Sequence, residues 1–253
     1  MKILYISNGS NFSGAGGMEY HLVDITNWLE EKGVETALAV RKGTYIHQNL
    51  LRDRPNVYPL SWTGFSKIQS LFQMAKAILD FSPEIISINR ERDIIRGFFV
   101  AKFMTLFLKK KPKIVSVFHN VGWKGSFILE KLDGMIFPNN YMKKGYVPAG
   151  APGDNKSTVI YHGVHLLKVD PGEKLNPNRP RKYFKDKGFP LIGMVGELRK
   201  NQSELVDVAY HLKKKIFDFT IAIVGRGTDD QIRSLKEKID HRDCQKTSLL
   251  PAE

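Results

Sequence analysis

The chain has almost no cysteine and no apolar run long enough to cross a membrane. Cys244 is the one cysteine among 253 residues, so no internal disulfide can form, which is typical of a reducing compartment. The longest apolar stretch, residues 94–108, contains Arg96 and Lys102 and is shorter than the roughly 20 residues that span a bilayer. Residues 1–7 are too short for the apolar region of a signal peptide. We therefore expect a cytoplasmic location, including the inner face of the cell membrane.

Several catalytic motifs are missing as well. The sequence has no Walker A loop, no cysteine or histidine cluster with zinc-ligand spacing, no G-x-S-x-G elbow and no recognisable nucleic-acid module. Acidic residues are also few, since 26 Asp and Glu stand against 39 Lys and Arg, which gives a formal charge of +13. This excess favours an anionic partner such as a phosphorylated substrate or an acidic membrane surface.

Segments with the apolar pattern of strands alternate with segments that have a helical pattern. We expect strands at residues 3–7, 34–40, 84–88, 114–119, 134–137, 158–162, 191–196 and 219–224. Helices are expected between them at residues 18–29, 68–79, 92–110, 204–216 and 229–239. Such alternation is typical of an α/β fold with parallel sheets. Both periods are lost over residues 170–190, which are rich in Pro, Lys and Arg, and again over residues 241–253.

This pattern predicts two Rossmann-like domains. The first, residues 1–168, is complete, residues 169–189 form a linker, and residues 190–253 form only part of a second domain. The second domain shows only two convincing strands, too few for a covered sheet, so we expect a chain that is truncated at its C-terminus.

Three loops at strand ends carry candidate site residues. The glycines of Gly14-Ala15-Gly16-Gly17 precede a helix, where free N–H groups and the helix dipole favour a phosphate; a plain flexible loop is the alternative. His119 ends a buried strand at the sheet edge where ligands bind in open α/β sheets, or it caps a loop. Arg199-Lys200 follow a strand and suit a diphosphate, or they form a solvated basic loop.

Aromatic and basic residues lie close together in residues 98–111. Phe98, Phe99, Phe103 and Phe107 are followed by Lys109 to Lys111. This composition suits attachment to an anionic membrane surface. The alternative is a core helix whose basic end matches the negative end of the helix dipole.

Taken in order, these segments resemble glycosyltransferase family 4 and its relatives in glycosyl transferases group 1, which have the GT-B fold. The motifs that carry the resemblance are Gly16-Gly17-Met18-Glu19, Lys32-Gly33, Pro83-Glu84-Ile85-Ile86, the strand ending at His119, Val159 to Val164, Val195 to Lys200, and Ile221 to Gly227. Two positions depart from the family pattern: His162 stands where Asn is usual, and Glu197 stands where Arg is usual. The E-x7-E motif of the family is absent from the chain.

The resemblance implies transfer of a sugar from a nucleotide-sugar donor to a glycan or lipid-linked acceptor with retention of configuration, as in polysaccharide biosynthesis. It implies that Gly16 and Gly17 approach the donor phosphates and that His119 contacts the donor sugar as a catalytic residue. Arg199 and Lys200 would neutralise the leaving diphosphate, so no metal or cofactor is expected. Without E-x7-E, little or no turnover is expected.

Two other hypotheses about the function stay open. One is an NADP-dependent oxidoreductase, since Gly14 and Gly16 lie in the right loop and Arg41-Lys42 could hold a 2′-phosphate. The G-x-G-x-x-G spacing fails, however, and the sequence has no Tyr-x-x-x-Lys pair. The other is a non-catalytic remnant that binds only an acceptor or a partner.

Overall fold

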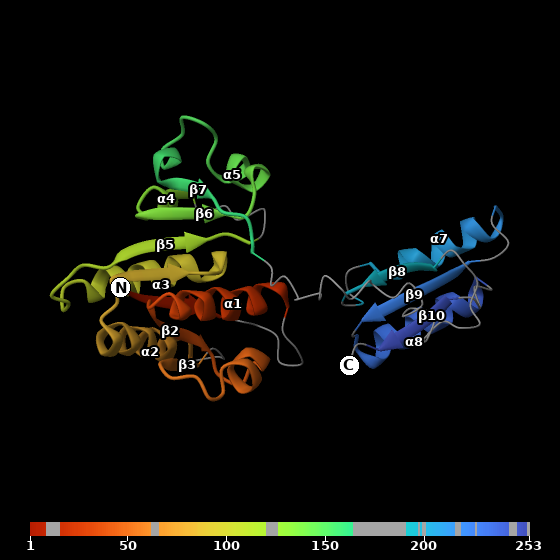
Figure 1. Ribbon diagram of the computed structural model, residues 1–253, viewed down its shortest axis with the longest axis horizontal. Coiled ribbons are helices and arrows are strands. Elements are labelled where there is room, and N and C mark those ends of the chain that lie inside the picture. Colours follow the sequence, from red (N-terminus) through yellow and green to blue (C-terminus); the bar gives the residue numbers. More distant parts are fainter. Residues whose placement is uncertain are drawn as a thin grey trace, which may run out of the picture. The chain divides into compact units, whose positions relative to one another are not determined.

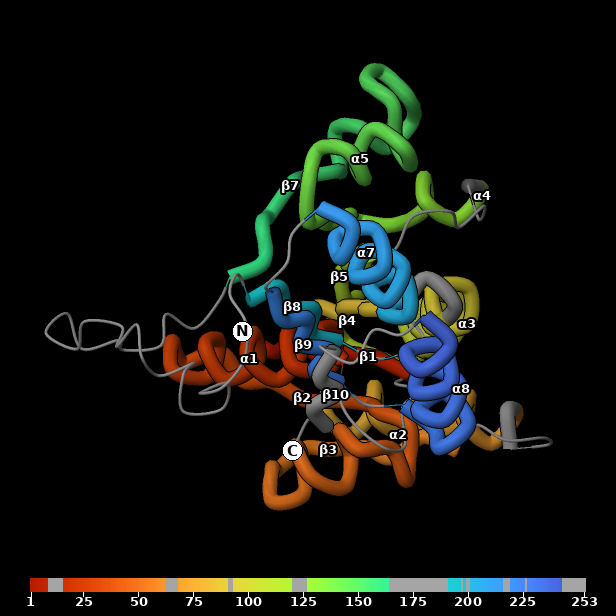
Figure 2. Tube along the Cα trace, turned by 90° about the vertical axis from the view of Figure 1, so that its right-hand side faces the viewer, coloured from red at the N-terminus to blue at the C-terminus, as the bar shows by residue number. Residues whose placement is uncertain are grey.

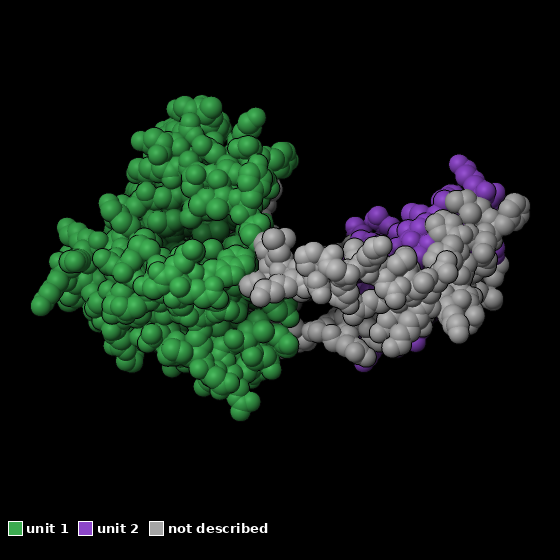
Figure 3. Space-filling view, viewed as in Figure 1, with its two compact units in different colours: residues 1–165 green, residues 166–253 purple. Residues whose placement is uncertain are grey.

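A computed structural model divides the chain into two compact units, residues 1–165 and 166–253 (Figure 3). The residues it describes are 1–8, 16–61, 66–119, 126–163, 191–196, 198, 201–215, 219–225, 227–242 and 247–251. The expected linker, residues 169–189, lies outside this described part.

Unit 1 is built on a seven-stranded parallel sheet with the strand order β3-β2-β1-β4-β5-β6-β7 (Figure 1). Its strands are β1 (Lys2–Ser7), β2 (Glu35–Arg41), β3 (Val57–Leu60), β4 (Ile85–Ile88), β5 (Lys113–Val117), β6 (Gly134–Phe137) and β7 (Ser157–Val159). The central register pairs Leu4 with Ala37 on β2 and with Ile86 on β4. The α/β fold expected from the sequence is thereby confirmed.

The helices of unit 1 connect these strands. They are α1 (Gly17–Glu31), α2 (Ser66–Phe81), α3 (Glu91–Met104), α4 (Ser126–Leu129) and α5 (Asn140–Tyr146), with the π-helix η1 (Ile46–Leu50) and the 3-10 helix η2 (Asp154–Lys156). The expected helix over residues 92–110 is too long, because α3 ends at Met104 and Thr105 caps it. The sequence pattern also missed β3, a four-residue edge strand that contains Pro59.

Helices cover both faces of this sheet because successive strand residues point to opposite sides. Leu4 and Ile6 of β1 pack in one core with α2 and α3, whereas Ile3 and Tyr5 pack in another with α1. Figure 2 shows α1 on one side of the sheet and α2 and α3 on the other. Burial raises the pKa of Tyr5 to about 12. Because both faces of the sheet are covered, its strands have continuous apolar runs in the sequence.

Unit 2 has a smaller parallel sheet with the order β10-β9-β8. Its elements are β8 (Leu191–Val195), α7 (Glu204–Lys213), β9 (Thr220–Gly225), α8 (Asp229–His241) and β10 (Thr247–Pro251). The two strands indicated by the sequence are joined by β10, which pairs with β9 from Thr247 to Pro251. The expectation of an irregular segment there was wrong, because a five-residue strand with two large apolar residues gives too weak a period to detect.

Candidate functional site

The first turn of α1 places two glycines at the carboxyl end of β1. Gly16 caps the helix, and its carbonyl accepts hydrogen bonds from the N–H groups of Glu19 and Tyr20. A methyl group added at Gly17 would meet no atom of the described residues within 4 Å. The backbone of Gly17 is therefore open to a neighbouring group at a helix N-terminus, which favours anions.

Glu19 holds this turn in place. Its Oε2 accepts a hydrogen bond of 3.0 Å from the Gly16 N–H, and its Oε1 lies 2.7 Å from Arg90 Nη2. Glu19 is buried, and Arg90 caps the start of α3. A second link runs from the Asn8 N–H to the buried carboxylate of Asp93 over 2.8 Å. Both links join the end of β1 and the start of α1 to the start of α3.

Three histidines meet at the same edge of the sheet. His119 follows β5, His162 follows β7, and His21 lies in the second turn of α1. The ring centroids are 4.1 Å apart for His21 and His162, 5.3 Å for His119 and His162, and 5.7 Å for His21 and His119. His119 and His162 stack with an interplanar angle of 15°. Among the described residues no group of three or more His, Cys, Asp or Glu could hold a metal ion.

The surroundings of His21 favour its neutral form. Burial lowers the pKa of His21, and its neighbour His162 lowers it further, while Asp24 acts in the opposite direction. His162 itself is exposed. The next residue, Gly163, packs closely against α1, since a methyl group at Gly163 would lie 3.0 Å from the Trp28 ring. A neutral imidazole can both donate and accept a hydrogen bond, which suits contact with sugar hydroxyls.

In unit 2, β8 and β9 end in a close approach of two glycines. A Cβ on Gly225 would lie 1.7 Å from the carbonyl oxygen of Gly196, so only glycine fits there. Gln202 is fully buried beside them and donates from Nε2 to the Gly196 carbonyl over 2.6 Å. Its Oε1 is buried and has no hydrogen-bond partner within the part of the chain that the structure describes.

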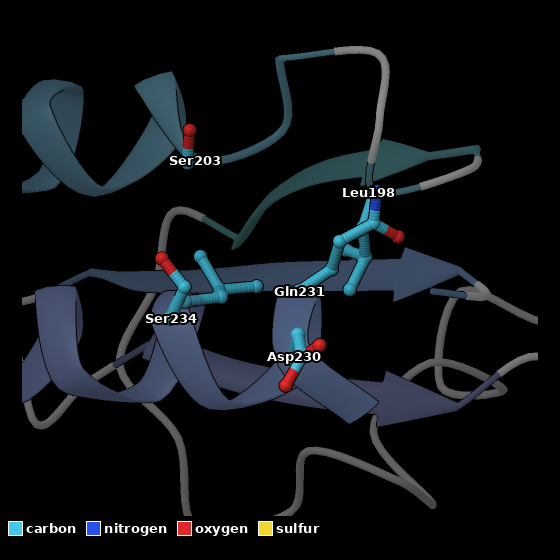
Figure 4. A pocket seen from close by; sticks show the side chains of 6 residues that line it. Leu198, Ser203, Asp230, Gln231 and Ser234 are labelled. Carbon is cyan, nitrogen blue, oxygen red and sulfur yellow. The ribbon is translucent and has the colours of Figure 1, made fainter. Parts of the chain in front are cut away.

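A cavity of about 270 Å³ lies in unit 2 (Figure 4). Its lining comes from Leu198 after β8, from Ser203 at the start of α7, and from the first turns of α8. The contributing α8 residues are Asp230, Gln231, Ser234 and Leu235. The cavity is thus formed at two helix N-termini at the carboxyl edge of the sheet, a position that suits a ligand in open α/β sheets.

The sequence-predicted site residues divide between the described and the undescribed parts of the chain. In unit 1, His119 lies beside α1, the helix that begins at Gly16 and Gly17. Arg199 and Lys200 lie outside the described residues. Sequence reasoning did not assign His21, Arg90 or Gln202 to the site. His162 was noticed only as a departure from a family pattern, and that departure was the available signal.

One outer face of unit 1 carries many exposed apolar side chains. They come from α2, from α3 beside it, and from the residues after α3: Ile68, Phe72, Leu79, Ile95, Phe99, Phe103, Leu106 and Phe107. Phe98 is buried in the core, so residues 98–111 supply both the core and the surface. Every helix in the described part of the chain is too short or too polar to span a bilayer.

Comparison with known proteins agrees with this architecture. The model of Glycosyltransferase Family 4 matches residues 15–167. Anabaena HepE, solved with UDP and glucose, is 17% identical with a TM-score of 0.71, covering 100% of this chain and 70% of HepE. A glycosyltransferase from Rickettsia africae is 19% identical with a TM-score of 0.75, covering 100% and 68%.

Sucrose-phosphate synthase from Thermosynechococcus elongatus is 14% identical with a TM-score of 0.70, covering 100% of this chain and 70% of that protein. A search of curated protein sequences found no match. At this identity the structural likeness establishes the fold, which is that of the GT-B glycosyltransferases. The family model matches more than half of the residues of this chain, so the chain belongs to glycosyltransferase family 4.

Proposed function

We propose that this protein takes part in retaining transfer of a sugar from a nucleotide-sugar donor to a glycan or lipid-linked acceptor. The observation that carries the proposal is the meeting of His119 with His21 and His162 beside the N-terminal half of α1, in a chain of family 4. HepE, which shares the fold, was solved with UDP and with UDP-glucose. The family match does not favour an NADP-dependent oxidoreductase.

Each unit has its own part in this proposal. Residues 1–168 form the acceptor-side domain, residues 169–189 connect the domains, and residues 190–253 belong to the donor-binding domain. The cavity between the starts of α7 and α8 supports a donor site in unit 2, because helix N-termini favour phosphate oxygens. Its lining also includes Asp230, whose carboxylate can accept hydrogen bonds from donor hydroxyls and therefore belongs beside the sugar or ribose and away from the phosphates. Gly16 and Gly17 offer the corresponding helix N-terminus in unit 1.

The reaction breaks the bond between the anomeric carbon and the diphosphate and forms a bond from that carbon to an acceptor hydroxyl oxygen, whose proton passes to the leaving diphosphate. Negative charge then builds up on the leaving diphosphate, and Arg199 and Lys200 stabilise it without a metal or cofactor. His119 donates a hydrogen bond to the donor sugar, which orients the anomeric carbon. His21 lies beside His119, and its lowered pKa favours the neutral imidazole, which can both donate and accept a hydrogen bond.

Peripheral contact with an anionic membrane belongs to the same proposal. The exposed aromatic side chains of α2 and α3 are accompanied by Lys102 and by Lys109 to Lys111. Apolar side chains enter the interfacial region of a bilayer while neighbouring lysines pair with anionic lipids. A lipid-linked acceptor would be reached from this position at the inner face of the membrane.

The proposal is tested by nucleotide binding and by turnover. Calorimetric titration with UDP should give saturable binding, and NADPH should give neither binding heat nor enhanced cofactor fluorescence. Turnover is measured as UDP release from a panel of UDP-sugars with a lipid extract as acceptor, and proton NMR reads the anomeric configuration of the product. NADPH binding, or a product of inverted configuration, would contradict the proposal. UDP binding with little or no release is the result expected of this chain, which contains no E-x7-E motif.

A further inference from the structure

A second cavity, with both polar and apolar lining residues, lies in unit 1 beside the edge strand of the sheet. It has a volume of about 680 Å³ and lies between η1 and β3. Its polar lining consists of His47, Gln48, Asn49, Arg52 and Arg54, with Leu51, Val57 and Pro59 as the apolar part. Cavities of this size hold small molecules, and a few polar groups on an apolar wall give them orientation.

The charged side chains of this lining are the two arginines, Arg52 and Arg54. No carboxylate is among the described residues that line this cavity. Arg52 is exposed, and no ion pair of its guanidinium is found within the described residues. Lys42 lies near enough to His47 to contribute to lowering its pKa, after the larger effect of burial. An arginine without a carboxylate partner is well suited to binding a phosphate or carboxylate oxygen.

Arg54 is fixed in place before any ligand arrives. Its Nη2 lies 2.6 Å from Glu30 Oε1, and its Nη1 donates to Asn27 Oδ1 over 2.7 Å. Nη2 also donates to Thr36 Oγ1 over 3.1 Å. These contacts hold the guanidinium against α1 and β2, so little side-chain freedom remains to be lost on binding.

Two buried nitrogens of the lining residues have no hydrogen-bond partner in the described part of the chain. They are Nε of Arg54 and Nδ1 of His47. Buried polar atoms are nearly always paired in proteins, so these two nitrogens are unusual polar positions behind the cavity wall. His47 lies in a π-helix, a rare element that is often found at functional sites.

A smaller cavity of about 290 Å³ adjoins the first and shares Asn49, Arg52 and Arg54 with it. It extends along α1 at Val23 and Asn27, which follow His21 on the same helix. Glu30 and Asp53 line only this smaller cavity. Carboxylates accept hydrogen bonds from sugar hydroxyls but repel anions, so an anionic group belongs in the larger cavity and a neutral ring belongs toward α1.

We propose that these adjoining cavities form an acceptor subsite for an anionic sugar, with its phosphate or carboxylate bound by the exposed guanidinium of Arg52 beside the fixed guanidinium of Arg54. Gln48 and Asn49 contact the sugar hydroxyls at the rim. The inference rests on the proposed glycosyl transfer, since it names the chemical class of the acceptor. It does not depend on the donor site in unit 2.

The test is histidine-detected NMR of the full chain titrated separately with glucose 6-phosphate, glucuronate and glucose. Both anions should shift the His47 ring signals saturably, and glucose should not. The anion that binds with the higher affinity identifies the acceptor group as a phosphate or a carboxylate. Arg52→Gln should weaken that anion about tenfold, whereas the matched control Lys131→Gln, an exposed lysine on the turn after α4, should leave it unchanged.

The absence of a saturable His47 shift with either anion would overturn the inference. Equal binding by Arg52→Gln and by the unsubstituted protein would overturn it too. Arg52 is exposed, so this variant should fold, and dispersion of the amide spectrum checks that it does. UDP titration of the same sample separates the two proposals: if UDP binds and the sugar anions do not, the acceptor subsite is wrong while the donor proposal stands.

Discussion

Arg90 Nη2 lies 2.7 Å from Glu19 Oε1, and both side chains are largely removed from solvent. The pair joins the first turn of α1 to the cap of α3, across two segments that are 71 residues apart in the sequence. Glu19 also binds the Gly16 N–H. The glutamate of the Gly-Gly-x-Glu motif therefore positions the glycine turn, and this role is separate from any contact with substrate.

Removing Glu19 should destabilise unit 1. Glu19→Ala removes the carboxylate that pairs with the largely buried guanidinium of Arg90. Removing one partner of a buried ion pair lowers the free energy of unfolding by about 3–5 kcal/mol. Urea denaturation followed by circular dichroism measures the free energy of unfolding. The matched control is Glu35→Ala, which removes an exposed pair with Lys2, and it should change stability little. Similar losses in the two variants would show that Glu19 has no such structural role.

The protonation of His21 should depend on His162. The pKa of His21 is below its ordinary value of about 6.5, because of burial first and His162 second. The folded protein therefore binds fewer protons there than the unfolded chain. The stabilising contribution of His21 is complete above about pH 6.5 and is lost as the pH falls through its folded pKa.

His162→Asn removes one of these two causes, so the pKa of His21 should rise toward its ordinary value while burial still holds it lower. Proton NMR titration of the ring signals measures it directly. The control is His241→Asn at the end of α8, which should leave His21 unchanged. An identical His21 titration in the His162→Asn variant would show that the two rings do not interact.

His119→Ala should lower kcat in any active preparation of this enzyme. Loss of a hydrogen bond that strengthens in the transition state costs roughly 2.7–4 kcal/mol, or about 100- to 1,000-fold, if it acts like an oxyanion-hole donor. UDP release under saturating donor measures kcat. His211→Ala, on an exposed position of α7, serves as the control. Full activity of His119→Ala would remove this residue from the proposed mechanism.

Membrane binding should depend on the aromatic face of unit 1. Phe103 and Phe107 are 60% and 62% exposed and contact each other at 5.6 Å between ring centroids. The double variant Phe103→Ser and Phe107→Ser should weaken binding to anionic vesicles roughly tenfold or more, because the variant lacks two apolar side chains that would be buried in the bilayer. Co-sedimentation measures binding, which should also fall as salt rises. Phe127→Ser, at an exposed phenylalanine of α4, should bind as before; equal loss there would argue against a specific face.

Gly225→Ala should destabilise unit 2. Its methyl group would meet the Gly196 carbonyl at 1.7 Å, so the ends of β8 and β9 must separate. Overpacking of this kind costs about 1–3 kcal/mol or more. Gly193→Ala in β8 is the matched control, because its nearest contact would be an ordinary 3.9 Å. Hydrogen exchange of the β9 amides should rise in the first variant alone, and unchanged protection in both would refute the close approach.

The sequence by itself determined the α/β fold and the order of its main elements. Short continuous apolar runs such as residues 3–6, followed by turn residues, indicate strands covered on both faces, and a glycine turn followed by an amphipathic segment indicates α1. It also placed His119 at the carboxyl edge, because parallel strands all end at the same side of a sheet. These inferences depend on local periodicity, which can be detected within a single segment without knowing its neighbours in the fold.

Only the tertiary structure decided which side chains meet. The pairing of Glu19 with Arg90, the contact of His21 with His162, and the cavity between η1 and β3 all join segments that are distant in the sequence. The short strands β3 and β10 were also decided there, since each contains a proline, which weakens a strand pattern. Pairing with β2 and β9 supplies their backbone hydrogen bonds. Sequence patterns record which way a side chain faces, whereas its partners depend on strand order and register.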